Sequence, residues 1–287
     1  MPSEFSLEGK NALVIGSSNV LGRAAAVALA EAGANVGVTT TTRSKREEVV
    51  ANSCANEIWA LDRKGFAQEI DAADEADVQA VVQRTVTELG SLDILVNAPD
   101  LPFAKPLPEI TPAEWRRAID VNLTGVYLAC RAAGVVMISA EGAPDSRGSG
   151  SNLIAGSSDS RGSGFNLTGA GRGGRIINIV SLLGERGLAN GSAYCAAQAG
   201  VLNFTRALAL EWARTGVTVN AIGAGWTEGM GIIGGPEGKA RLERYLPYKR
   251  LGKPDEIAGA VVYLASDVAE YLTGQVIWIE GGALSHV

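Results

Sequence analysis

The chain has 287 residues and a formal net charge of −6, and 46% of its residues are hydrophobic, which is enough for a core and excludes a disordered chain. Its 36 glycines show no three-residue period and it has only 10 prolines, which excludes a collagen-like protein. The 25 basic residues form no stripe or arm, so nucleic acid is not expected as a partner.

Seven short apolar segments are predicted as strands: Asn11–Gly16, Asn35–Thr40, Phe66–Asp71, Asp93–Ala98, Arg175–Ser181, Thr218–Gly223 and Val276–Glu280. Six longer segments are predicted as helices: Leu21–Ala32, Ser44–Ala60, Glu75–Leu89, Pro112–Ile138, Ser192–Thr215 and Pro254–Ala265. Continuous apolar runs are typical of strands that are buried on both faces. The alternation of strands and helices therefore predicts an α/β, Rossmann-like fold, in which a doubly wound parallel sheet of about seven strands lies between two helical layers. We expect one domain over residues 1–287, with ligands at the carboxyl ends of the strands.

One segment, residues 140–174, breaks this pattern. It contains 10 glycines, and Asp145–Leu153 is repeated with little change as Asp159–Leu167. Two copies are too few for a repeat architecture. We interpret the segment as a Gly/Ser-rich insertion on the surface of the domain, and a lid or an oligomer contact is the alternative.

The remaining composition limits the chemistry. The single histidine is His286, which disfavours histidine-based catalysis and a histidine metal site. The three cysteines are widely spaced and give no disulfide framework. We read no signal peptide at the first residues and no apolar run of about 18 residues, so we expect a cytoplasmic protein that does not span a membrane.

The first strand–helix junction is a candidate phosphate-binding turn. Glycines at such a junction allow a tight turn and bring the first amides of the helix close to a pyrophosphate. The candidate cofactor-binding residues here are Gly16, Ser18, Val20, Leu21 and Gly22.

Together with four later segments, this turn resembles the short-chain dehydrogenase/reductase family over nearly the whole chain. The matching segments are Ile15–Gly22, Asn97-Ala98-Pro99-Asp100, Val121-Asn122-Leu123, Ser181, and Tyr194-Cys195-Ala196-Ala197-Gln198. The resemblance implies that Ser181 binds a substrate oxygen, Tyr194 exchanges a proton with it, Asn122 holds a water of the proton relay, and position 198 binds the nicotinamide ribose.

The chain departs from the family pattern on the surface that would face the cofactor. Gln198 replaces the lysine that lowers the tyrosine pKa, and without a cation about one Tyr194 in a thousand would be ionised at pH 7. Val20 replaces a glycine of the turn, and Asn97-Ala98-Pro99-Asp100 replaces the family's N-N-A-G. Ala224 and Gly229 replace a proline and a threonine after the sixth strand.

Other positions predict the choice of cofactor. Asp71 matches an aspartate that contacts adenine, and Asn97 follows the fourth strand. The segment Thr39–Arg46 has no acidic residue, whereas Thr41 and Arg43 offer a hydroxyl and a cation that suit a 2′-phosphate. The expected cofactor is therefore NADP(H), and a solvated helix start with basic residues is the alternative interpretation of this segment.

The leading hypothesis is an atypical oxidoreductase that interconverts a carbonyl and an alcohol with NADP(H). One alternative keeps Ser181 and Tyr194 and drops the nucleotide, as in the halohydrin dehalogenases, which have a similar fold, or in a lyase or isomerase. Another is a non-catalytic homologue. The resemblance implies a small-molecule substrate and a homotetramer or homodimer. The segment Trp226–Gly235 is interpreted either as a substrate flap or as packing.

Overall fold

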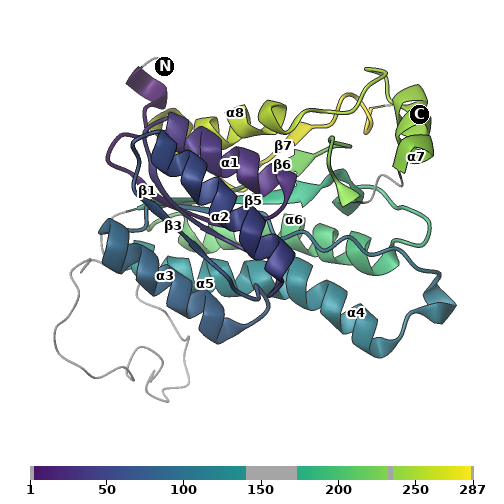
Figure 1. The fold of residues 1–287 in the computed structure, drawn as a ribbon, viewed down its shortest axis with the longest axis horizontal. Helices are drawn as coiled ribbons and strands as arrows, with labels where there is room; N and C mark the ends of the chain where they lie inside the picture. The colour runs from purple at the N-terminus through teal and green to yellow at the C-terminus, as the bar shows by residue number, and fades with distance from the viewer. Residues whose placement is uncertain (1–2, 140–172, 232–234, 286–287) are drawn as a thin grey trace.

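The computed structural model describes residues 3–139, 173–231 and 235–285 (Figure 1). The predicted insertion at 140–174 lies outside the described residues except for Gly173 and Gly174, so its proposed roles stay predictions.

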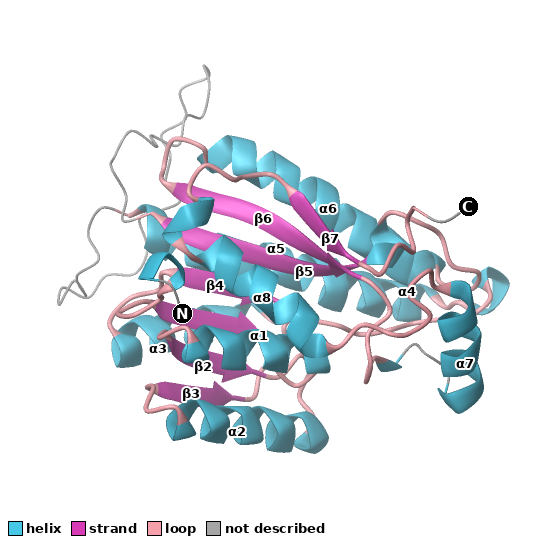
Figure 2. Ribbon diagram, turned by 90° about the horizontal axis from the view of Figure 1, so that it is seen from above, coloured by secondary structure: helices cyan, strands magenta, loops and turns pink. Residues whose placement is uncertain are grey.

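A seven-stranded parallel sheet forms the centre of the domain, in the order β3-β2-β1-β4-β5-β6-β7 (Figure 2). Its strands are β1 Asn11–Ile15, β2 Asn35–Thr39, β3 Gly65–Gln68, β4 Ile94–Asn97, β5 Gly174–Ser181, β6 Val217–Ala224 and β7 Val276–Ile279. In register, Leu13 pairs with Gly37 of β2 on one side and with Leu95 of β4 on the other. The predicted doubly wound parallel sheet is confirmed.

Helices cover both faces of the sheet (Figure 1). Helices α1 Val20–Glu31, α2 Lys45–Ala60 and α8 Pro254–Ala265 pack on the face to which Ala12 and Val14 point. Helices α3 Glu75–Leu89, α5 Gly125–Ile138 and α6 Ser192–Trp212 pack on the opposite face, against Leu13 and Ile15. Both faces of β1 are thus buried, which explains its continuous apolar sequence.

The helix predicted over Pro112–Ile138 is divided by an irregular turn. Helix α4, Pro112–Ile119, begins with a capping box between Thr111 and Glu114 and runs into a π-helical turn at Asp120–Thr124 that continues as α5. Such turns occur frequently at functional sites, and this one contains Asn122. Helix α7, Gly235–Tyr245, was not predicted.

The expectation that no run of about 18 residues is apolar enough to span a membrane was wrong, because by length and composition alone Pro112–Ile138 could cross one, with a mean hydropathy of 1.5 over 18 residues. More than half of that window is buried, and Val126, Ala129, Cys130 and Ala133 belong to the core. A core helix explains the apolar sequence.

The strand order reverses between β1 and β4, because β2 and β3 continue on one side and β5 to β7 on the other. The loops that leave the carboxyl ends of β1 and β4 therefore separate at this point and leave a crevice, where ligands bind in open α/β sheets.

Candidate active site

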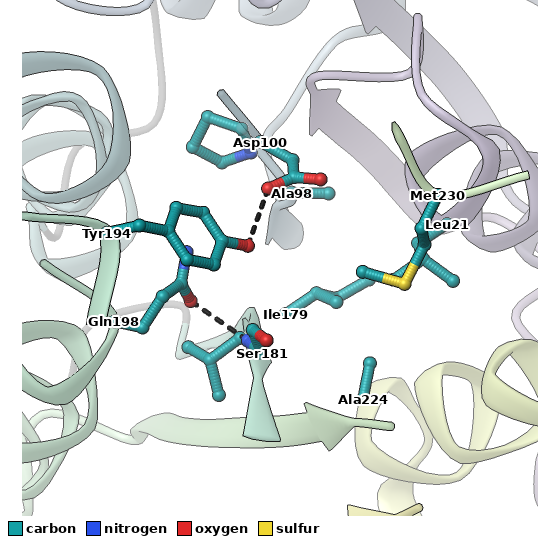
Figure 3. A pocket seen from close by; sticks show the side chains of 11 residues that line it. Leu21, Ala98, Asp100, Ile179, Ser181, Tyr194, Gln198, Ala224 and Met230 are labelled. Carbon is teal, nitrogen blue, oxygen red and sulfur yellow. Dashed lines mark hydrogen bonds between the residues drawn. The ribbon is translucent and has the colours of Figure 1, made fainter. Parts of the chain in front are cut away.

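A small cavity lies at the carboxyl ends of β4, β5 and β6, beside the first turn of α1 (Figure 3). It is lined by Leu21, Ala98, Pro99, Asp100, Ile179, Val180, Ser181, Tyr194, Gln198, Ala224 and Met230. Three of the four predicted catalytic residues, Ser181, Tyr194 and Gln198, thus meet at one place. The cavity measures about 20 Å³, which is room for about one water molecule.

Asp100, which directly follows Pro99 after β4, binds the predicted catalytic tyrosine. The Tyr194 hydroxyl donates a hydrogen bond of 2.7 Å to Asp100 Oδ1 (Figure 3). Tyr194 is only 2% exposed. Sequence reasoning identified Asp100 as a departure from the family pattern but did not predict this contact, which joins residues 94 positions apart.

This pair has unusual acid–base properties. Burial raises the pKa of Tyr194 well above its ordinary value, and the Asp100 charge and hydrogen bond raise it further. Burial also raises the pKa of Asp100, and the hydrogen bond from Tyr194 offsets this only in part. Both groups therefore favour their neutral forms more than they would in water.

The raised Asp100 pKa predicts a pH-dependent effect of Asp100→Asn on stability. The folded state holds the Asp100 proton more tightly than the unfolded state, so this group stabilises the fold at low pH, and that stabilisation is lost as the pH rises through the folded pKa. We expect Asp100→Asn to be more stable than the wild type at pH 7, because it carries no buried charge, and the difference to shrink towards pH 4, where Asp100 becomes protonated. Urea unfolding of both proteins across this range measures it, and a difference that grows on acidification would contradict the assignment.

Gln198 supports the end of β5. Its side-chain oxygen accepts a hydrogen bond of 2.9 Å from the Ser181 amide, and the Ser181 hydroxyl accepts one of 3.2 Å from the Leu183 amide. Because residues 194 and 198 lie one helical turn apart on α6, Gln198 and Tyr194 face the same cavity. Gln198 thus fixes the position of Ser181 and adds no charge.

Asn122 does not line the cavity but holds the loop that does. Its side-chain oxygen accepts from the Leu101 amide at 2.9 Å, and its nitrogen donates to the Leu101 and Ala118 carbonyls. The π-helical turn therefore anchors the chain directly after Asp100. The predicted water-holding role of Asn122 stays a prediction.

The predicted phosphate-binding turn has the expected close packing. Gly16 has a φ of +87°, and a β-carbon there would lie 2.5 Å from the Ala98 carbonyl oxygen. A β-carbon on Gly22 would lie 2.2 Å from the Gly16 oxygen. Asn19 caps α1 by accepting from the amides of Leu21 and Gly22 at 3.1 and 3.0 Å, and these are amides that would face a pyrophosphate.

Val20 and Gly229 are two departures from the family pattern that contact each other. A β-carbon on Gly229 would lie 2.7 Å from Val20 Cγ1, so the space for a side chain at 229 is already filled by Val20. The next residue, Met230, lies across the cavity from Tyr194 (Figure 3).

A second polar cluster lies where β2 ends. The Glu47 carboxylate, from the first turn of α2, accepts hydrogen bonds from the Ser18 hydroxyl at 2.7 Å, the Thr41 and Thr42 amides at 2.7 and 3.0 Å, and the Thr42 hydroxyl at 2.6 Å. Burial alone would raise the Glu47 pKa, but these hydrogen bonds outweigh it and lower the pKa. Glu47 directly follows the segment Thr39–Arg46, in which the sequence shows no acidic residue, and for this reason the sequence did not predict its contact with Ser18.

The other predicted cofactor residues have protein partners. Arg43 is exposed and forms two hydrogen bonds to Asp77. Asp71 pairs with Arg117 at 3.0 Å. Asn97 is fully buried and donates to Asn178, and its side-chain oxygen has no hydrogen-bond partner among the described residues. Their roles toward a cofactor stay predictions.

Comparison with known proteins gives a consistent result. Residues 10–158 match a family model described as short chain dehydrogenase, and residues 166–283 match one described as enoyl-(acyl carrier protein) reductase. A cis-4-hydroxycyclohexanecarboxylate dehydrogenase of Sinomonas cyclohexanicum is 33% identical over 273 residues, which cover 94% of this chain and 95% of the relative. A 3-oxoacyl-[acyl-carrier-protein] reductase of Staphylococcus aureus is also 33% identical, with coverages of 95% and 97%. The crystal structure of a gluconate 5-dehydrogenase from Burkholderia cenocepacia, in complex with NADP and tartrate, superposes with a TM-score of 0.79 at 26% identity and covers 99% of this chain and 98% of its own.

Proposed function

Because the chain belongs to the short-chain dehydrogenase/reductase family of oxidoreductases, we propose that it interconverts a carbonyl compound and an alcohol with a nicotinamide dinucleotide. The observation that carries the proposal is the convergence of Ser181 and Tyr194 on one cavity at the reversal of strand order. Two hydroxyl groups at this place suit the binding and protonation of a single oxygen atom.

The residues present fit the adenosine half of such a cofactor. The Glu47 carboxylate, held by the donors of Ser18, Thr41 and Thr42 where β2 ends, would accept hydrogen bonds from the ribose hydroxyls, and the tight Gly16 turn leads into α1. At the other end, the cavity beside Tyr194 measures only about 20 Å³, so a nicotinamide ring would require lining side chains such as Met230 to move. Methionine is flexible and adapts readily, so this movement is inexpensive.

The bound cofactor would supply or accept a hydride, and the protein would control the oxygen of the substrate. The Ser181 hydroxyl, which accepts a hydrogen bond from the Leu183 amide, would donate one to that oxygen. Tyr194 would give it a proton in reduction and remove one in oxidation. The apolar groups of Leu21, Ile179, Ala224 and Met230 would exclude water from the reacting atoms.

The direct test measures cofactor oxidation at 340 nm with NADH and with NADPH, using 9,10-phenanthrenequinone as a carbonyl probe. Loss of the reduced cofactor at a rate proportional to enzyme concentration supports the proposal. Absence of turnover together with absence of cofactor binding in calorimetry would favour the cofactor-free Ser181/Tyr194 enzyme or the non-catalytic homologue. The small volume of the cavity is the observation that favours these alternatives, because a nicotinamide ring needs more room.

The sequence predicts NADP(H), but Glu47 supports NAD(H) for this chain. The Glu47 carboxylate is held in place by hydrogen bonds from Ser18, Thr41 and Thr42. It can accept hydrogen bonds from ribose hydroxyls and would repel a 2′-phosphate. Arg43, the cation expected to bind that phosphate, is paired with Asp77. We therefore propose a preference for NAD(H) over NADP(H).

Replacement of Glu47 by alanine should reverse this preference. We expect NADPH affinity to rise at least about tenfold, which corresponds to about 1.4 kcal/mol, and NADH affinity to fall or stay constant. Calorimetric titration with both cofactors measures the change. Glu48→Ala is the matched control, because Glu48 pairs with the exposed Lys45. Equal NADPH affinity in Glu47→Ala and the wild type would exclude Glu47 as the discriminating residue.

A further inference from the structure

We propose that Asp100 donates a proton to Tyr194 in reduction and accepts one from it in oxidation. In this way Asp100 would take over the role of the cation that is absent at position 198. The inference rests on the proposed function. Its geometric basis is the 2.7 Å hydrogen bond between Tyr194 Oη and Asp100 Oδ1 inside a cavity that also contains Ser181. This distance is ordinary for a hydrogen bond between a hydroxyl and a carboxyl oxygen.

The surroundings of the pair exclude a mechanism that depends on a stable tyrosinate. The described residues that line the cavity include no lysine and no arginine, and Gln198 is neutral and bound to Ser181. An ionised Asp100 beside a tyrosinate would place two negative charges in contact in a buried site. Tyr194 can therefore lose its proton to a substrate only if Asp100 supplies another.

A protonated Asp100 meets this requirement, because it can donate its carboxyl proton to Tyr194 Oη across the same 2.7 Å, which reverses the direction of the hydrogen bond and leaves the Tyr194 proton free for the substrate oxygen. A bound reduced cofactor would be the source of the hydride that adds to the carbonyl carbon in reduction. The π electrons of the carbonyl would then move onto its oxygen, which would take the proton of Tyr194. The Asp100 carboxyl proton passes to Tyr194 Oη at the same time. The products are the alcohol, the oxidised cofactor, a neutral Tyr194 and an Asp100 carboxylate, which regains its proton from water. Oxidation follows the same path in reverse, with the Asp100 carboxylate as the final acceptor.

This relay gives the two directions opposite pH dependences. Reduction requires protonated Asp100 and should decline as the pH rises through its pKa, whereas oxidation requires the carboxylate and should rise over the same range. The other groups that act on the pair are Ser181 at the end of β5, and Cys195 on α6, whose charge would raise the Tyr194 pKa. Neither provides a positive charge.

The test compares the wild type with Asp100→Asn, which keeps an oxygen acceptor for Tyr194 but cannot transfer a proton. With NADH and 9,10-phenanthrenequinone, we expect kcat for reduction to fall about 10²-fold or more, with KM little changed. The decline of the reduction rate with rising pH that is assigned to Asp100 should also disappear. If Asp100 only supports the fold, Asp100→Asn should retain the wild-type rate and pH profile, and that result would overturn the relay. Glu75→Gln, which removes an exposed carboxylate paired with Arg131, is the matched control.

A second measurement needs no cofactor. Ultraviolet difference titration reports tyrosinate formation, and the contribution of Tyr194 is the part that is absent in Tyr194→Phe. We expect this contribution to appear at lower pH in Asp100→Asn, because the neighbouring charge has been removed. An unchanged titration would overturn the coupling. Absence of wild-type turnover would reject the proposed function and the relay together, whereas turnover with an unaltered Asp100→Asn profile rejects the relay alone.

Discussion

Tyr194→Phe is expected to reduce turnover by about 10²- to 10⁴-fold, because the phenol is the proton donor that is placed to reach a substrate oxygen beside Ser181. Cofactor affinity should be nearly unchanged, since the phenylalanine ring keeps the shape of the cavity wall. Steady-state rates of NADH oxidation with 9,10-phenanthrenequinone, together with calorimetric NADH titrations, measure both quantities. A variant that keeps more than about a tenth of the wild-type rate would show that Tyr194 is not the proton donor.

The same variant has a predicted effect on stability. Loss of the hydroxyl leaves the Asp100 carboxylate without the hydrogen bond that now lowers its pKa, so the cost at pH 7 should be about 1–3 kcal/mol. This cost should decrease as the pH falls, because a protonated Asp100 needs the donor less. Tyr127→Phe is the control, since Tyr127 is exposed and contacts Phe204 by its ring edge.

The sequence was sufficient to predict the fold because the information is local. Each strand of the sheet is a short continuous apolar segment, and the helices between them have their own start signals, such as Asp74 at the start of α3, which caps two amides. The predicted and observed bounds of α3 and α8 agree at every residue. The division of Pro112–Ile138 was not predicted because a π-helical turn does not change the apolar pattern.

The contacts of the candidate site were harder to predict from the sequence. Some of them join residues that are distant in the chain, and others involve one of two neighbouring residues of the same type that the sequence does not distinguish. Glu47 and Glu48 are both acidic residues in the first turn of α2, and only the packing of α2 shows that Glu47 points toward Ser18. The departures at Val20 and Gly229 look independent in the sequence, yet they fill one space. Asp100 and Gln198 are likewise distant in the sequence, yet they line the same cavity.

The shared cavity of Asp100 and Gln198 predicts the outcome of restoring the family's lysine at position 198. In Gln198→Lys, the ammonium group would pair with Asp100 and hold it in the ionised form, so reduction at pH 7 should not increase and its pH limb should move to lower pH. In Gln198→Lys combined with Asp100→Gly, the cation acts on Tyr194 alone and should lower its pKa by about 1–3 units. We therefore expect the double variant to be more active at pH 7 than either single variant.

A double-mutant cycle in kcat measures this coupling, with Gln198→Met as the control for loss of the hydrogen bond to the Ser181 amide. Residues 100 and 198 line the same cavity, so the two changes should be strongly non-additive. Additive changes, or a full gain of activity in Gln198→Lys alone, would mean that Asp100 does not control Tyr194. A non-additive gain confined to the double variant would instead show that Asp100 and Gln198 act together in place of the family's lysine. Each change would then raise activity only when the other is present.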